Sequence, residues 1–307
     1  MSGLSYISLV CEPSSRHLHL SLAEASISTA MVVGTLVNGP AIEIWGLNIL
    51  VYITLTFCAC SATLVSLFLV DIPKEHARTF KWRQLLRPKH LLDVFRCIAR
   101  PRQQNGRPLL GLSFLAYLLV YTTIQGFITV SFLYFVKEVG LTLTQFSVFN
   151  STMYVLKSVV GPLFQFIAVK LSISKYNVAV AAAASSVLAY TTMSLGTSGY
   201  LQWMGIALLS GQACITSVLH DFQASLVERD ELGKLFACDA FLQAVWGVIA
   251  TVGYNALYGC LVTWQPQFIF AASSLLFLLA LITLCLLIIL FQKHKVDRIS
   301  ASSHSCN

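Results

Sequence analysis

The chain has 307 residues, of which 56% are apolar and only 11% are charged. A chain with so few polar residues cannot cover the surface of a soluble globular domain. The composition therefore excludes a water-soluble domain and indicates a polytopic membrane protein. The net charge of +7 does not indicate nucleic-acid binding, because half of the 20 Lys and Arg residues lie in one linker between apolar segments. The nine cysteines show no disulfide framework and no metal-ligand spacing.

Eight apolar segments are long enough to cross a membrane, because a spanning helix needs about 20 mainly apolar residues. In chain order they are residues 18–38, 47–70, 109–136, 143–169, 176–195, 201–221, 236–257 and 267–291. Two of them precede the basic linker, residues 71–108, and six follow it. Two six-helix halves joined by a long inner loop are typical of the major facilitator fold.

We therefore expect an all-α polytopic membrane protein with the major facilitator fold. Residues 1–70 would hold the last two helices of the N-terminal six-helix half, and residues 71–108 the basic cytoplasmic central loop. Residues 109–291 would form the C-terminal six-helix half, and residues 292–307 a cytoplasmic tail. Eight of twelve helices would then be present, and the chain would be truncated at its N-terminus.

The positions of Lys and Arg predict the orientation, because cytoplasmic loops carry an excess of both residues. If the linker is cytoplasmic, 18 of the 20 basic residues fall on the inner side, Lys137 falls outside, and Lys157 lies within a span. Both termini are therefore expected in the cytoplasm. The sequence carries no decisive targeting signal, so it is compatible with the plasma membrane and with an endolysosomal membrane.

Two stretches resemble the proton-coupled folate transporter family, solute carrier family 46. One is SLVERDELGKLFA, residues 225–237, followed by an apolar helix and then FIFAASSLLFLL; the other is EPSSRHLHLSLAEAS near the start. The resemblance runs through the whole chain in order and is strongest over residues 216–278. It implies the major facilitator fold and proton-coupled transport of a folate-like organic anion.

Glu24 is the first candidate for proton coupling. It lies about two turns, or roughly 12 Å, from Arg16 and belongs to a polar stripe on the first helix. One interpretation is a shallow carboxylate that caps or pairs near the inner surface. The other is a carboxylate that gains and loses a proton as access alternates; the family resemblance favours this, because a glutamate of the fifth helix is tied to proton coupling there.

Lys157 lies in the middle of the fourth predicted helix, where an ionisable residue is a functional candidate. It shares a helix face with Asn150 and Tyr154, which we predict to bind substrate with it. Three alternatives are open for its partner: Glu24 across the two halves, an anionic substrate, or backbone carbonyls.

The third predicted helix carries Tyr117, Tyr121 and Gln125 at four-residue steps. An aromatic stripe of this kind is often simple packing. Because the seventh helix of the major facilitator fold lines the cavity, we also predict these three residues to contact substrate.

His220 stands near the inner end of the sixth predicted helix, where the resembling family carries an arginine. An imidazole, which can be neutral or protonated, replaces a permanently charged guanidinium there. This makes His220 a second candidate for proton coupling. A solvated residue at the membrane interface is the alternative. Asp239 follows the start of the next helix, and we expect it to cap that helix through the dipole.

These features predict a secondary transporter that moves a small organic anion with protons across the lipid bilayer. No cofactor is expected, because the sequence has no nucleotide-binding loop and a proton gradient would supply the energy. The alternative is a truncated, non-transporting membrane protein that binds a partner, of unknown oligomeric state. An enzyme is not expected, because neither an HExxH nor a GxSxG motif is present.

Overall fold

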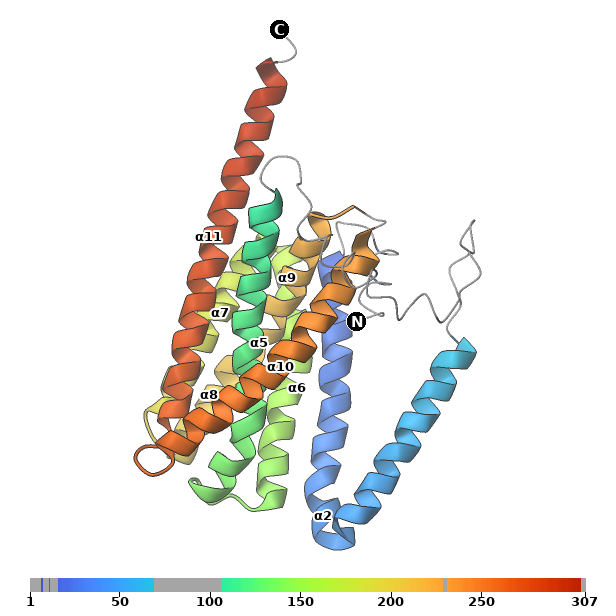
Figure 1. Cartoon of the computed structure of the whole chain (residues 1–307), viewed down its shortest axis with the longest axis vertical. Coiled ribbons are helices and arrows are strands. Elements are labelled where there is room, and N and C mark those ends of the chain that lie inside the picture. The colour runs from blue at the N-terminus through green and yellow to red at the C-terminus, as the bar shows by residue number, and fades with distance from the viewer. Residues whose placement is uncertain (1–6, 8–10, 12–15, 69–105, 229–230, 305–307) are drawn as a thin grey trace.

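A computed structural model of the chain describes residues 7, 11, 16–68, 106–228 and 231–304, and Figure 1 shows its helices packed side by side. The elements are α2 (Arg16–Phe68), α5 (Gly106–Lys137), α6 (Leu143–Lys170), α7 (Lys175–Ser194), α8 (Gly199–Leu208), the 3-10 turn η2 (Leu209–Gly211), α9 (Gln212–Ser225), α10 (Leu232–Leu261) and α11 (Phe268–His304). The described residues contain no strand.

Six helices of the described part are long and apolar enough to cross a membrane: Arg16–Gly46, Arg107–Lys137, Leu143–Lys170, Gly199–Ser225, Leu232–Leu261 and Phe268–Lys293. α5 and α6 run in opposite directions, as do α10 and α11 (Figure 1). The all-α membrane fold expected from the sequence is therefore confirmed.

α2 contains both helices expected before the linker, and it bends sharply between them (Figure 1). The bend lies at Gly46, whose backbone φ is 77°. Residues other than glycine rarely adopt this conformation. The first half packs against α6 and α9, whereas residues 48–64 of the second half are almost entirely exposed. Gly39 permits the close approach to α6, because a Cβ there would lie 2.3 Å from the Ser147 Oγ.

α5, α7, α9, α10 and α11 enclose the main apolar core. Its centre is aromatic: the ring of Phe270 lies against Tyr134 and Phe135, with ring centroids 4.8 Å and 6.3 Å apart. α5 and α10 meet at Gly126, where a Cβ would lie 2.2 Å from the Tyr254 ring. The core thus fixes the positions of α5 and α10, which form part of the site described below.

The observed helices differ from the predicted ones in several places. Two of the eight predicted spans, 47–70 and 176–195, are not among the six described helices that are long and apolar enough to cross a membrane. The predicted span 201–221 is divided by the 3-10 turn Leu209–Gly211. α10 begins at Leu232, four residues earlier than expected, and α11 continues to His304 through most of the expected tail. Most of the predicted linker, residues 71–105, lies outside the described residues, so the domain division remains a prediction.

Candidate functional site

A cavity of about 410 Å³ lies between α2, α5, α6 and α9, with single contributions from α7 and α10. Its polar lining side chains are Glu24, Ser28, Tyr121, Tyr154, Lys157, Tyr190, Gln212, Thr216 and Gln243. The rest of the lining is apolar: Ile27, Met31, Ile124, Phe127, Ile128, Met153 and Ala213. The volume is within the range of about 300 to 1,000 Å³ that is usual for small-molecule sites.

Lys157 projects from the middle of α6 into this cavity. Its Nζ donates a hydrogen bond of 2.7 Å to Oε1 of Gln212 and lies 5.9 Å from the centroid of the Tyr154 ring. An ammonium group has three donors, so one bond to a neutral amide leaves capacity for an anion. The interpretation in which backbone carbonyls alone hold this lysine is wrong, because a side-chain amide binds it.

Glu24 of α2 lines the same cavity. Among the described residues, no ion pair within 4 Å joins it to Lys157, so the two charges face one cavity without direct contact. Its place in the cavity wall disagrees with a shallow capping role near the inner surface. A carboxylate and a cation are thus both available to whatever occupies the space between them.

The remaining predicted substrate-binding residues divide into two groups. Tyr121 and Tyr154 line the cavity. Tyr117 is buried behind it, where its hydroxyl accepts a hydrogen bond from Gln243. The described lining includes neither Gln125, which lies against Gly247 of α10, nor Asn150.

Five polar lining residues were not among the predicted site residues: Ser28, Tyr190, Gln212, Thr216 and Gln243. Gln212 binds the one cation of the described lining, and Gln243 connects the cavity to the residues behind it. The two glutamines could have been found from the sequence, because a side-chain amide within an apolar span is costly to bury without a hydrogen-bond partner. The predicted amides, Gln125 and Asn150, were chosen because they share a helix face with the tyrosines or with Lys157, and that criterion does not select Gln212 or Gln243.

A second polar group lies behind the cavity, between α5, α9 and α10. His220 is 1% exposed and Asp239 is fully buried, with Nδ1 of the imidazole 3.5 Å from Oδ2 of the carboxylate. The ring of Tyr117 lies 4.9 Å from the imidazole. The solvated interpretation of His220 is therefore wrong. The capping role of Asp239 is also wrong, because α10 begins seven residues earlier at Leu232.

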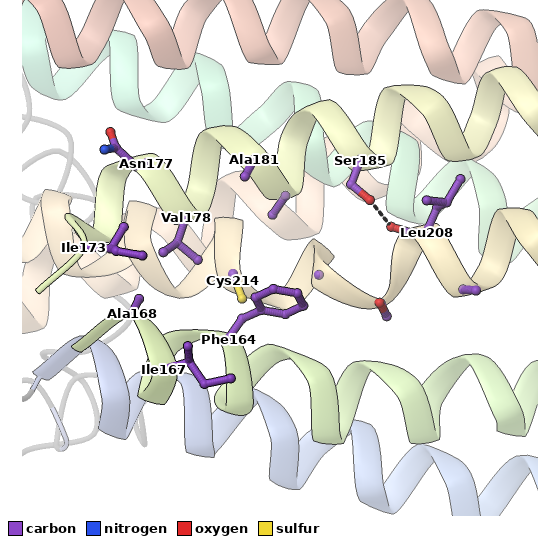
Figure 2. Close-up of a pocket in the computed structure, with 14 residues that line it drawn as sticks. Phe164, Ile167, Ala168, Ile173, Asn177, Val178, Ala181, Ser185, Leu208 and Cys214 are labelled. Carbon is purple, nitrogen blue, oxygen red and sulfur yellow. Dashed lines mark hydrogen bonds between the residues drawn. The ribbon is translucent and has the colours of Figure 1, made fainter. Parts of the chain in front are cut away.

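A larger pocket of about 620 Å³ lies between α6, α7 and the α8 to α9 segment. Figure 2 shows Phe164 and Ile167 of α6 on one side of it and Val178 and Ala181 of α7 on the other. Its lining is mainly apolar, with Asn177, Ser185 and Ser210 as the polar side chains, and the Ser185 hydroxyl donates to the Leu208 carbonyl at 2.7 Å. The pocket with charged groups on its wall is the smaller one, and that is the candidate site.

Comparisons with known proteins agree with this architecture. Over 69 residues, 22% of this chain, the chain is 44% identical to the human lysosomal proton-coupled steroid conjugate and bile acid symporter SLC46A3. The rat protein of the same name is 40% identical over 70 residues, 23% of this chain. Each matched segment spans 15% of the relative's own length. The resemblance to solute carrier family 46 is thus confirmed over that segment.

The fold is similar to the crystal structure of the human organic anion transporter MFSD10 (TETRAN), with a TM-score of 0.64 and 20% sequence identity. The match covers 92% of this chain and 66% of that one. The family model of the Major Facilitator Superfamily matches residues 1–251, which include the cavity-lining helices from α2 to α9 and most of α10. The chain therefore belongs to the Major Facilitator Superfamily and is an integral, multi-pass membrane protein.

Proposed function

We propose that this protein is a secondary transporter that carries an amphipathic organic anion together with a proton. The observation that carries this proposal is the shared cavity of Lys157 and Glu24, in which the lysine is bonded to the neutral amide of Gln212. An anionic group that enters finds a cation with free donors on one wall and a carboxylate on another.

The two charges provide a reason for coupling. Lys157 attracts the anion, whereas an ionised Glu24 repels it, and both effects are stronger in a partly buried cavity than in bulk water. Protonation of Glu24 removes the repulsion, so the proton and the anion favour each other's binding. Such coupling is reciprocal, because the proton must improve anion binding by the same factor as the anion improves proton binding.

The lining favours a particular class of anion. Apart from Glu24 and Lys157, the described wall consists of apolar side chains, tyrosines and a few neutral polar groups. A solute with a bulky apolar body and one anionic group fits this wall better than a folate, which brings two carboxylates and a polar ring. Relatives that are similar over 15% of their length are named as symporters of steroid conjugates and bile acids, and we propose the same class here.

Those relatives are also named as lysosomal proteins. An endolysosomal membrane suits a proton-driven symporter, because the acidic lumen supplies the proton gradient. We therefore propose this location rather than the plasma membrane, with substrate leaving the lumen for the cytosol.

Uptake of labelled taurocholate, a conjugated bile acid, tests the proposal in cells that carry the chain at their surface. We expect uptake to rise when the external medium is acidified and to be abolished by a protonophore. A labelled reduced folate serves as the comparison and is expected to enter more slowly. Acid-stimulated folate uptake without taurocholate uptake would reject the substrate class, and no uptake of either despite surface expression would reject transport of both.

A further inference from the structure

The buried pair formed by His220 of α9 and Asp239 of α10 lies outside the described lining of the cavity. Gln243 connects the two places: it lines the cavity, and its Nε2 donates a bond of 3.2 Å to Oδ2 of Asp239. The same nitrogen donates to the hydroxyl of Tyr117. The cavity and the buried pair therefore share a hydrogen-bonded wall.

The pair has unused hydrogen-bonding capacity. Oδ1 of Asp239 and Nδ1 of His220 have no hydrogen-bond partner among the described residues, although both side chains are almost completely buried. Buried polar groups that only hold helices together are normally satisfied, because an unpaired group in a low-dielectric interior is costly. A buried carboxylate with one unsatisfied oxygen, whose other oxygen lies 3.5 Å from an imidazole nitrogen, is better explained as a place where a proton binds and is released.

We propose that Asp239 and His220 form a second proton-binding site, behind the cavity, which gains and loses one proton in each transport cycle. The inference rests on the proposed proton-coupled transport and adds a site to Glu24. Without the proton the pair carries one negative charge; with it the pair is neutral, as a carboxylic acid beside an imidazole or as a carboxylate beside an imidazolium. A buried site favours the neutral form until a change of access exposes it.

Other titratable groups face the pair from the surrounding helices. Glu24 of α2 and Tyr121 of α5 act on the Asp239 carboxylate electrostatically, and Tyr117 of α5 contacts the imidazole. Asp221, next to His220 in α9, is already paired with Lys175 of α7. A negative Glu24 and a negative Asp239 repel each other. Protonation of one carboxylate therefore lowers the proton affinity of the other, which links the two sites.

The first test is the dependence of initial taurocholate uptake on pH. At pH values above the titration of both sites, each proton that must bind contributes about a tenfold fall in rate per pH unit. Asp239→Asn keeps the shape of the side chain and removes the titration, so the fall should decrease from about a hundredfold to about tenfold per pH unit. Asp239→Glu should restore the steeper dependence.

The matched control is Thr251→Val, which removes the 3.4 Å contact between Thr129 and Thr251 at the same α5 to α10 interface without removing a titratable group. It should leave the steepness of the pH dependence unchanged. An Asp239→Asn variant that reaches the membrane and keeps the full steepness would overturn the proposal.

Infrared difference spectra of the purified chain on acidification separate this inference from the transport proposal, since they need no substrate. Besides any carboxylic-acid band of Glu24, the wild type should show a carbonyl band of protonated Asp239 or ring bands of protonated His220. These bands should disappear in Asp239→Asn, and in His220→Gln a carbonyl band of Asp239 should appear with a shifted midpoint. If the wild type takes up no probe but these bands titrate, the transport proposal fails and the proton site stands. If Asp239→Asn leaves every carboxylic-acid and imidazolium band unchanged, the proton site fails.

Discussion

Replacing Lys157 by methionine should weaken anion binding without unfolding the protein. Methionine keeps the length and the apolar stem of lysine and removes the charge that bonds to Gln212. A hydrogen bond to a charged group contributes about 1.5 to 3 kcal/mol, which corresponds to a loss of affinity of roughly 10- to 150-fold. The fold should tolerate the change, because it no longer has to desolvate a cation within the membrane.

The assay is the concentration dependence of taurocholate uptake at a fixed acidic pH, together with a thermal unfolding scan of the purified variant. Lys170→Met is the matched control, since Lys170 lies at the exposed end of the same helix, outside the described cavity lining. The control should take up substrate as the wild type does. A Lys157→Met variant with wild-type half-saturation and unchanged pH dependence would refute the role assigned to this lysine.

Two glycine contacts give predictions about packing. Gly126→Ala would place a methyl group 2.2 Å from the ring of Tyr254, and we expect about 1 to 3 kcal/mol of destabilisation in a thermal scan; Gly111→Ala, with open space around the added carbon, should be close to neutral. Gly39→Ala should similarly loosen α2 from α6, seen as faster proteolysis of α2, whereas Gly34→Ala on the same helix should not. Equal effects within either pair would contradict the close approaches seen in the structure.

The sequence predicts the membrane helices well, because a span of about 20 apolar residues is a strong signal. It predicts the helix ends poorly. Charged residues of the segment ERDELGK suggested that the seventh helix starts after them, yet α10 begins at Leu232, inside that segment. The shift moves Asp239 from the helix end into the bundle, and with it changes the chemistry that can be assigned to the residue.

The faces of helices explain the errors in the predicted site. Steps of four residues turn a helix by about 40° each, so side chains eight residues apart face directions about 80° apart. Tyr121 lines the cavity and also reaches Gly247 of α10, while Tyr117 lies against His220. Gln125 lies near the same glycine but outside the described lining. Asn150 shares a face with Lys157 but lies seven residues, or roughly 10 Å, along the axis, which takes it beyond the cavity.

In the proposed mechanism, one cavity binds an anion through Lys157 and a proton through Glu24. Acid-driven accumulation and substrate exchange, compared in proteoliposomes, separate these two roles. We expect Glu24→Gln still to exchange internal unlabelled taurocholate for external labelled taurocholate but no longer to accumulate it when the outside is made acidic. Accumulation by Glu24→Gln that equals the wild type, with the same dependence on pH, would contradict this mechanism.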